Sequence, residues 1–94
     1  MKITVILPTY NEKVNIIKLI PILEEEIFPK IKIHDMHILV VDDNSPDGTA
    51  EEVKEFAKKW KNIELLLGNK QGLGAAYARG MHYAMDEMKA EAII

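Results

Sequence analysis

Carboxylates gather in two short loops of this 94-residue chain, and each loop lies between an apolar run and a helix-like stretch. One loop holds Asp42, Asp43 and Asp47, and the other holds Glu12 close to Tyr10. Carboxylate oxygens accept hydrogen bonds from N–H and hydroxyl groups, such as those of a base or a ribose, and a tyrosine ring can lie flat against either. Their negative charge repels phosphate unless a metal ion offsets it. The loops therefore suit the nucleoside end of a nucleotide.

Part of the acidic loop also has a purely structural explanation. The segment Thr49–Glu52 has the spacing of a capping box, so we assign Asp47 and Thr49 to the start of a helix. Asp42 and Asp43 can be read as residues that merely end a strand. Two adjacent carboxylates at the end of a buried strand are costly without partners, however. We therefore predict a binding role for this pair, chiefly for Asp43.

The other binding candidates lie in the first loop and in a glycine-containing loop. Pro8 stiffens the first loop, and Tyr10 fits a base contact and a half-buried aromatic side chain equally well. Gly72 and Gly74 resemble a phosphate-cradling turn only weakly, because Tyr77 stands where G-x-G-x-x-G needs its third glycine. A glycine pair at a helix start is more often a tight turn.

Two cations near the glycine-containing loop, Lys70 and Arg79, could meet a phosphate or simply be solvated. The histidines have no mutual spacing that suits a metal site, so His34, His37 and His82 receive no role.

The apolar runs before the loops predict buried strands, because they are short and rich in β-branched residues. These runs are Ile3–Leu7, Met36–Val41 and Ile63–Leu67, and a fourth run begins at Ala92. The first helix is predicted to begin with Asn11 as its N-cap and to end near Pro29, with a kink or restart at Pro21. Its apolar residues fall mostly on one face: Val14, Ile17, Leu19, Ile20, Leu23 and Ile27.

The second and third helices are predicted from the spacing of apolar and small residues. The second carries an apolar stripe of Val53, Phe56, Ala57 and Trp60. The third runs from Leu73 to about Met88, and close packing on the sheet is allowed by Ala75, Ala76, Ala78 and Gly80. A second apolar line in this helix, predicted to fill the core, consists of Met81, Met85 and Met88.

Alternating strands and helices predict an α/β fold, namely a Rossmann-like parallel sheet with right-handed crossovers and helices on both faces. The predicted strand order is 3-2-1, with the fourth strand beside the first. All the candidate loops then lie at the carboxyl ends of the strands, where open α/β sheets bind ligands.

Composition limits the function classes. The net charge of −3 argues against a nucleic-acid partner. The absence of cysteine excludes disulfides and thiolate metal sites, and a cytoplasmic chain is the simplest interpretation. The run Ile3–Leu7 is too short for a signal peptide or a membrane span.

Three segments together resemble family 2 glycosyltransferases, and within them the dolichol-phosphate (polyprenol-phosphate) mannosyltransferase group. These segments are Val5–Glu12, Val40–Thr49 and Gly72–Gly80. The resemblance implies a GT-A fold, a nucleotide-sugar donor expected to be GDP-mannose, and a polyprenyl phosphate acceptor. Residues 1–94 are then the nucleotide-sugar-binding, N-terminal half of that domain, cut at its fourth strand. The full-length protein is expected in the cytoplasm, at the cytoplasmic face of the membrane.

The resemblance also implies roles for single residues. By this resemblance, Pro8, Tyr10 and Glu12 are expected to contact the nucleoside. The base is expected to be contacted chiefly by Asp43, with Asp42 beside it. The family's glycine-containing loop closes over the nucleotide, and by resemblance this role is expected of Gly72, Gly74 and Arg79. The divalent metal of the complete enzyme, Mg²⁺ or Mn²⁺, is held in that family by an Asp-x-Asp motif after the fourth strand. Its ligands are not expected in this chain, and the isolated chain is expected to be inactive with no catalytic residue assigned.

Two alternatives remain at this stage. One is a non-catalytic nucleotide-binding module. The other is a signalling receiver domain, suggested by the acidic pair after Ile38–Val41, although receivers carry that pair on their first strand and an acid after their third. An incomplete fourth strand also leaves the first strand as an apolar edge, which predicts self-association.

Overall fold

The computed structural model describes residues 1–69 and 72–94. Four strands alternate with three α-helices, and a π-helical turn and a 3-10 turn, Leu23–Ile27 and Phe28–Lys30, extend the first helix. The strands are β1 Lys2–Thr9, β2 Asp35–Asp42, β3 Ile63–Leu67 and β4 Ala92–Ile93. The α-helices are α1 Lys13–Ile22, α2 Thr49–Lys59 and α3 Leu73–Asp86. Each predicted strand is present, and β1 and β2 are longer than their apolar runs.

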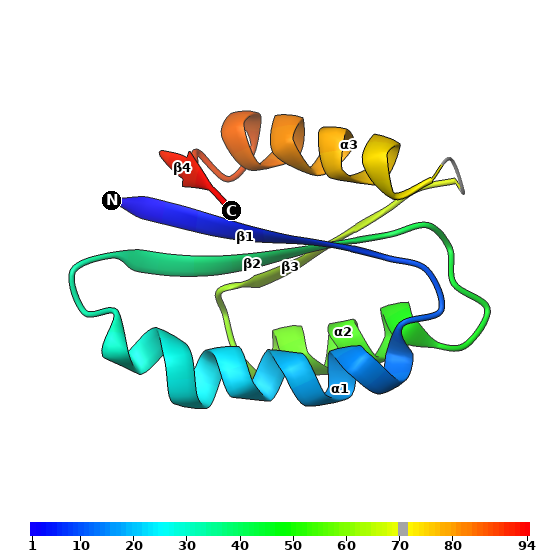
Figure 1. Ribbon diagram of the computed structural model, residues 1–94, viewed down its shortest axis with the longest axis horizontal. Coiled ribbons are helices and arrows are strands. Elements are labelled where there is room, and N and C mark those ends of the chain that lie inside the picture. Colours follow the sequence, from blue (N-terminus) through cyan, green and yellow to red (C-terminus); the bar gives the residue numbers. More distant parts are fainter. Residues whose placement is uncertain (70–71) are drawn as a thin grey trace.

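The strands form one parallel sheet in the order β3-β2-β1-β4, which confirms the predicted topology. Helices α1 and α2 cover one face of the sheet and α3 covers the other, as Figure 1 shows. Neighbouring strands end together, since Thr9 is level with Asp42 and Asp42 is level with Leu67. The predicted α/β, Rossmann-like class is therefore confirmed, and the loops after the three strands meet at one edge.

The middle of strand β2, Ile38–Val41, is apolar because both of its faces are buried there. Ile38 and Val40 belong to the core beneath α1 and α2, whereas Leu39 and Val41 belong to the core beneath α3. The predicted stripe of α2 lies in the first of these cores, where Val53 is fully buried. The central strand thus fixes both helical layers relative to the sheet.

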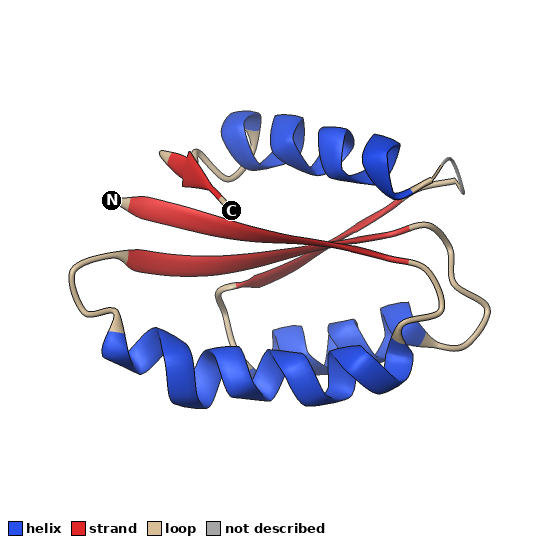
Figure 2. Cartoon of the chain, viewed as in Figure 1, coloured by secondary structure: helices blue, strands red, loops and turns tan. Residues whose placement is uncertain are grey.

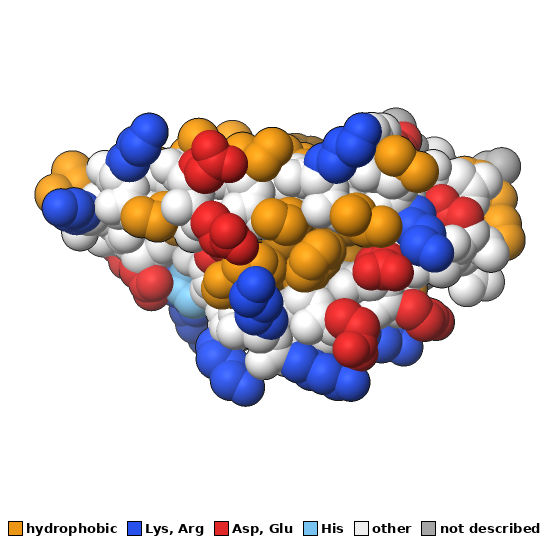
Figure 3. Space-filling view, turned by 90° about the horizontal axis from the view of Figure 1, so that it is seen from below, with side chains coloured by type: hydrophobic (Ala, Val, Ile, Leu, Met, Phe, Trp, Pro, Cys, Tyr) orange, Lys and Arg blue, Asp and Glu red, His pale blue; other side chains and the backbone are white. Residues whose placement is uncertain are grey.

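Helix α1 buries a different stripe from the one predicted. Ile16 and Ile20 face the core, whereas Val14 and Ile17 are exposed, as are Leu19, Ile22 and Ile27. The space-filling view of this side of the molecule shows apolar side chains surrounded by charged ones (Figure 3). The helix runs through Pro21 and then widens into the π-helical turn. A proline cannot donate its backbone hydrogen bond, so the predicted disturbance is present as a change of helix type.

Helix α3 packs through residues spaced four apart, and Ala76, Ala84 and Met88 are buried with Gly80 between them. The predicted methionine core is wrong for Met81 and Met85, which are 37% and 46% exposed. Each follows a sheet-facing residue directly, and one step along an α-helix turns a side chain by about 100°. Ala78 is exposed because it lies two positions from both Ala76 and Gly80, and two steps along an α-helix turn a side chain by about 200°.

The predicted helix caps are wrong in detail. Asn11 adopts a left-handed backbone with φ 55°, and the N-cap of α1 is Glu12, without a side-chain capping bond. The N-cap of α2 is Gly48, so Thr49 is the first helical residue rather than the cap. A single carboxylate serves both helices. The Asp47 Oδ2 accepts from the backbone N–H of Lys13 at 3.2 Å, and its Oδ1 accepts from that of Thr49 at 3.0 Å.

We expect Asp47→Asn to lower the unfolding temperature by a few degrees at pH 7, with a difference that vanishes in acid. The hydrogen bond from the Thr49 hydroxyl, and the backbone bonds at Lys13 and Thr49, hold the pKa of Asp47 below its ordinary value of 3.8. A lowered pKa in the folded state adds stability above pH 3.8 that is lost as the pH falls through the folded-state pKa. Thermal unfolding of both proteins between pH 2 and 7 measures this. Asp86→Asn, on an exposed site, is the control, and a difference that persists at pH 2 would contradict the prediction.

The unpaired edge of β1 is shorter than the sequence predicts, because β4 pairs with part of it. Strand β4 pairs with Ile3 and Thr4, and the backbone of Ile94 continues the ladder to Ile6. By alternation, Pro8 is the next residue of β1 that faces this edge, and it has no N–H to offer. Within the described ranges, the far side of β4 has no strand partner.

We expect the isolated 94-residue chain to self-associate through this edge, because an unpaired ladder next to the 63%-exposed Ile94 favours strand addition. Sedimentation at concentrations on the order of tens of micromolar is the measurement. Ile94→Lys should shift the chain toward monomer, because a charge on an edge strand opposes pairing. A wild-type chain that sediments as a monomer would contradict this expectation.

Candidate functional site

The candidate residues converge on the edge of the sheet where β1, β2 and β3 end. The loops after β1 and β2 leave this edge side by side, and α3 begins at the same end of the molecule (Figure 2). The backbone ties the loops together: the N–H of Asp43 donates to the carbonyl of Thr9 at 3.0 Å, and the N–H of Gly68 donates to that of Asp42 at 3.0 Å. Polar groups on three separate strands are thereby held close to one another.

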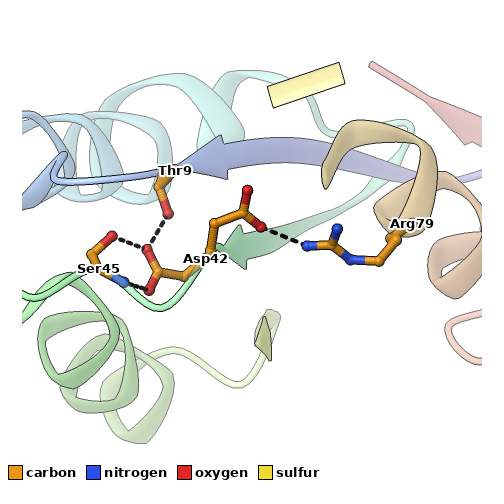
Figure 4. A network of polar contacts seen from close by, with 5 residues as sticks. Thr9, Asp42, Ser45 and Arg79 are labelled. Atoms are coloured by element: carbon orange, nitrogen blue, oxygen red, sulfur yellow. Dashed lines mark hydrogen bonds and ion pairs between the residues drawn. The ribbon is translucent and has the colours of Figure 1, made fainter. Parts of the chain in front are cut away.

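Asp42 is fully buried and anchors the two loops. Its Oδ1 accepts from the Thr9 hydroxyl at 2.8 Å and from the Ser45 hydroxyl, and its Oδ2 accepts from the Ser45 backbone N–H at 2.9 Å (Figure 4). The Ser45 hydroxyl also accepts from the backbone N–H of Asn11 at 2.9 Å. The buried charge is therefore compensated by three donors, and it fixes the acidic loop against the first loop.

Asp43 points to the other side of the sheet, where α3 lies. Its Oδ1 is 2.6 Å from Nη2 of Arg79, and its side chain is only 1% exposed whereas that of Arg79 is 31% exposed. The pair joins the end of β2 to the middle of α3. The prediction that the two adjacent carboxylates need partners holds in both cases, and each carboxylate has partners of its own.

Pro8 and Glu12 line a hollow of about 150 Å³ between the end of β1 and the first turns of α1. Glu12 accepts a hydrogen bond there from the side chain of Asn15 at 2.7 Å. The other lining residues are Leu7, Thr9, Asn15, Ile16 and Leu19. This group and the Asp43–Arg79 pair therefore lie at one edge but on different sides of the sheet, so a ligand of both must cross the strand ends.

The glycines stand where α3 begins. Gly72 is the N-cap and adopts φ 94°, a conformation that L side chains rarely adopt, and Gly74 lies in the first helical turn. Both are exposed. The candidate Lys70 lies outside the described residues. Tyr10 is half-buried beside Asn11 and has an interaction partner.

Sequence reasoning missed Thr9, Ser45 and Gly68. Thr9 and Ser45 were visible as hydroxyl residues next to the predicted strand ends, a position from which they can bond a neighbouring carboxylate. Gly68 had no such signal, since its importance depends on how closely α3 approaches β3.

The residues described here do not assemble a divalent cation site. Within residues 1–69 and 72–94, no three His, Cys, Asp or Glu side chains come close enough to hold a metal ion. The adjacent aspartates are turned apart, one to Ser45 and one to Arg79. A search of the same residues also finds no helix long and apolar enough to cross a membrane.

Three parallel strands end at one edge of the sheet, and the loop after the second strand is acidic. A comparison of the sequence with known families agrees with this arrangement. The sequence model described as "Glycosyl transferase family 2" matches residues 4–92. The chain belongs to this family. The match begins within β1 and ends at the first residue of β4, and it includes the two loops that carry the carboxylates. It confirms the family suggested by the motifs.

Two proteins are among the relatives of this family 2 chain. It is 35% identical over 92 residues to a dolichol-phosphate mannosyltransferase of Pyrococcus furiosus, covering 94% of this chain and 24% of the relative. It is 38% identical over 69 residues to the glycosyltransferase AglE of Haloferax volcanii, covering 73% of this chain and 22% of the relative. The chain therefore spans about a quarter of the length of these relatives.

A solved structure shares the fold. It is the mannosyltransferase PcManGT from Pyrobaculum calidifontis in complex with GDP-Man and Mn²⁺, with a TM-score of 0.74 and 29% identity over 87% of this chain and 24% of that one. The predicted GT-A arrangement of this family 2 chain is confirmed by this likeness. The receiver alternative conflicts with the family match and with the strand order, since the acidic pair follows β2 and not β1.

Proposed function

We propose that this chain is the nucleotide-sugar-binding, N-terminal half of the GT-A domain of a glycosyltransferase, which moves a sugar from a nucleotide-sugar to a lipid-linked phosphate. The donor is GDP-mannose and the acceptor is a polyprenyl phosphate such as dolichyl phosphate. The proposal rests on the motif resemblance, the mannosyltransferase relative, and the structural neighbour whose complex holds GDP-Man. In this proposal transfer takes place at the cytoplasmic face of the membrane.

The observation that carries the proposal is the ordered pair of carboxylates at the ends of parallel strands. The carboxylate of Asp42 already accepts hydrogen bonds from Thr9 and Ser45, so we assign Asp42 to positioning the loops. Asp43 is assigned to the base, because a carboxylate can accept from the ring N–H and amino groups of guanine. Pro8, Tyr10 and Glu12 are assigned to the ribose and the base from the opposite side of the strand ends.

The start of α3 is assigned to the nucleotide's diphosphate. Backbone N–H groups at a helix N-terminus point outward and favour anions, and Gly72 and Gly74 let a ligand approach the backbone closely. The described carboxylates do not fit a metal ion. The proposal therefore places the ligands of Mg²⁺ or Mn²⁺ outside the residues discussed here and assigns this chain to donor binding alone.

The test is calorimetric titration of the protein, expressed from its natural reading frame, with GDP, UDP and GDP-mannose, each with and without Mg²⁺ or Mn²⁺. The proposal expects GDP and GDP-mannose to bind more tightly than UDP, and the cation to strengthen both. Equal binding of GDP and UDP would reject the assignment of Asp43 to guanine. The lack of any nucleotide binding would reject the proposal as a whole.

A second candidate, a non-catalytic nucleotide-binding module, is favoured by one observation: the described residues bring no metal-binding cluster to the nucleotide edge. The two candidates differ in turnover. Incubation with GDP-mannose and a short-chain polyprenyl phosphate should yield the glycolipid and GDP if the protein is a transferase. Binding of GDP-mannose without release of GDP would favour the module.

A further inference from the structure

The outward face of α1 carries large apolar side chains that the described part of the chain leaves uncovered. Val14 is 66% exposed and Ile22 is 43% exposed, and Ile17 and Leu19 are exposed as well. Figure 3 looks onto this side of the molecule and shows apolar side chains in the middle of the face, with charged ones around them. Single exposed apolar residues are common on protein surfaces, whereas a group of them on one face marks an interaction site.

Helix formation alone does not explain these residues. Val14, Ile17 and Ile22 are β-branched, and β-branched side chains lose rotational freedom in a helix. Burial against the sheet would offset that cost, but the helix buries Ile16 and Ile20 there instead. The outward face therefore lowers the helix propensity of α1 without adding to the core, as expected of a surface that is covered in an assembly.

Charged side chains divide this face into a basic part and an acidic part. Residues four apart form a ridge along a helix, and the ridge through Ile22, here called the outer ridge, consists of Val14, Lys18, Ile22 and Glu26. The π-helical turn that holds Glu26 is wider than an α-helical turn, which keeps this residue on the side of Ile22. Lys18 and Glu26 are exposed, and neither forms an ion pair within residues 1–69 and 72–94.

The charges of the first helix that face α2, by contrast, already have partners. Nζ of Lys13 is 4.0 Å from Oε1 of Glu52, and Nζ of Lys59 is 3.8 Å from Oε1 of Glu25. The chain thus pairs the charges on the α2 side of the helix internally, and the charges of the outer ridge are left for a partner beyond the described residues.

We propose that the outer ridge binds the same ridge of a second copy of this chain. A two-fold contact is self-complementary, because residue i of one protomer meets residue j of its partner while j meets i. When two α1 helices pack antiparallel with Ile22 of both protomers at the two-fold axis, Lys18 of each lies opposite Glu26 of the other. A parallel contact would instead place like charges together. Packing of two such ridges is also the commonest way in which helices meet in globular proteins.

A lipid surface is the competing occupant, because helices with an apolar face and flanking lysines lie at membrane interfaces. Three consecutive glutamates, Glu24–Glu26, follow the exposed Ile22, however, and anionic lipids repel negative charge. A second copy accommodates Glu26 as well as Lys18, whereas an anionic membrane accommodates the lysine alone. The inference does not depend on the proposed function, since no residue of the outer ridge lines the hollow at the strand ends.

The experiment measures the mass of the protein, expressed from its natural reading frame, by sedimentation equilibrium over micromolar to millimolar concentrations. The wild type is expected to dimerise. Lys18→Glu gives a ridge with two negative charges and Glu26→Lys gives one with two positive charges, so each variant repels its own copy. We expect each to raise the dissociation constant of the dimer about tenfold, because two attractive pairs become repulsive. Asp86→Lys, a charge reversal at an exposed site on the opposite side of the sheet, is the matched control (Figure 1).

A mixture of the two variants gives the decisive observation. In a mixed dimer a negative ridge faces a positive one, so equimolar Lys18→Glu and Glu26→Lys should associate as tightly as the wild type. The double variant should also recover, because it only exchanges the two signs. Misfolding cannot produce either recovery. Both substitutions also suit the helix dipole, since they move negative charge toward the amino end of α1 and positive charge toward its carboxyl end.

Three results would overturn the inference. The first is a wild type that stays monomeric over the whole range, and binding of that monomer to vesicles of phosphatidylcholine and phosphatidylserine would assign the face to a lipid surface. The second is a dimer that neither single variant weakens, which would place the contact elsewhere, such as the edge at β4. The third is a dimer that both variants weaken and their mixture does not restore, because Lys18 and Glu26 would then not meet across the interface.

Discussion

Asp43→Asn is expected to weaken GDP binding by about ten- to a hundredfold, the range that corresponds to a hydrogen bond with a charged group. The asparagine oxygen can still accept the bond from Arg79, so the ion pair becomes an ordinary hydrogen bond and the loop keeps its anchor at Asp42. The amide oxygen has two acceptor sites, however, and Arg79 takes one of them, while the amide nitrogen is itself a donor, so one of the two base donors loses its acceptor. A site built to bond a base loses most of its selectivity when one acceptor becomes a donor.

The measurement is calorimetric titration with GDP and UDP at fixed salt concentration. Asp86→Asn is the matched control, because Asp86 is an exposed aspartate at the end of α3 and the same charge is removed away from the sheet edge. UDP binding should fall less than GDP binding in Asp43→Asn. Unchanged GDP affinity, with the fold intact, would remove Asp43 from the site and leave the hollow at Pro8 and Glu12 as the remaining candidate.

The sheet could be predicted from the sequence because its signals are local. Each apolar run is short and followed by turn-forming polar residues, and the helices between the runs force parallel strands with one handedness. The prediction that the candidate loops meet at one edge of the sheet followed from topology alone, since parallel strands separated by helices present their carboxyl ends together. Thr9, Asp42 and Leu67 are level in the structure, as that argument requires.

The contacts that organise the edge could not be predicted, because they join residues far apart in the chain. Asp43 and Arg79 are 36 positions apart, and nothing in the spacing of either motif indicates that they meet. The predicted helix caps were wrong for a related reason. The capping box at Thr49 has the correct local pattern, but one carboxylate at Asp47 reaches two helix starts because β1 and β2 end side by side. Tertiary placement overrode a local signal.

The methionine line of α3 shows how a single close contact sets the orientation of a helix. Met81, Met85 and Met88 and the row of Ala76, Gly80 and Ala84 are both plausible core faces from spacing alone. The structure turns the second row to the sheet, because its small side chains let the helix approach closely. Packing density, which periodicity does not report, decided between them.

Gly80→Ala is therefore expected to destabilise the fold although alanine is the better helix former. A Cβ atom at residue 80 would lie 2.8 Å from Cγ2 of Val41 and 2.9 Å from Cγ2 of Ile6. Both neighbours are buried and β-branched, and a β-branched side chain has little freedom to rotate away. Overpacking of this kind costs about 1–3 kcal/mol, whereas the gain in helix propensity is about 0.5–1 kcal/mol. We expect a net loss of about 0.5–2 kcal/mol, which is the difference between the low ends and between the high ends of these two ranges.

Gly74→Ala is the matched control, because it makes the same substitution in the same helix. A Cβ atom there meets no heavy atom of the described residues within 4 Å, and its φ is not in the left-handed range. This variant should be neutral or more stable by about 0.5 kcal/mol. Urea denaturation of the three proteins measures both differences, and Gly80→Val should extend the loss because it adds two methyl groups at the same contact. If Gly80→Ala were as stable as Gly74→Ala, α3 would have room to move away from β1 and β2, and the close approach at Gly80 would not be what sets the orientation of the helix.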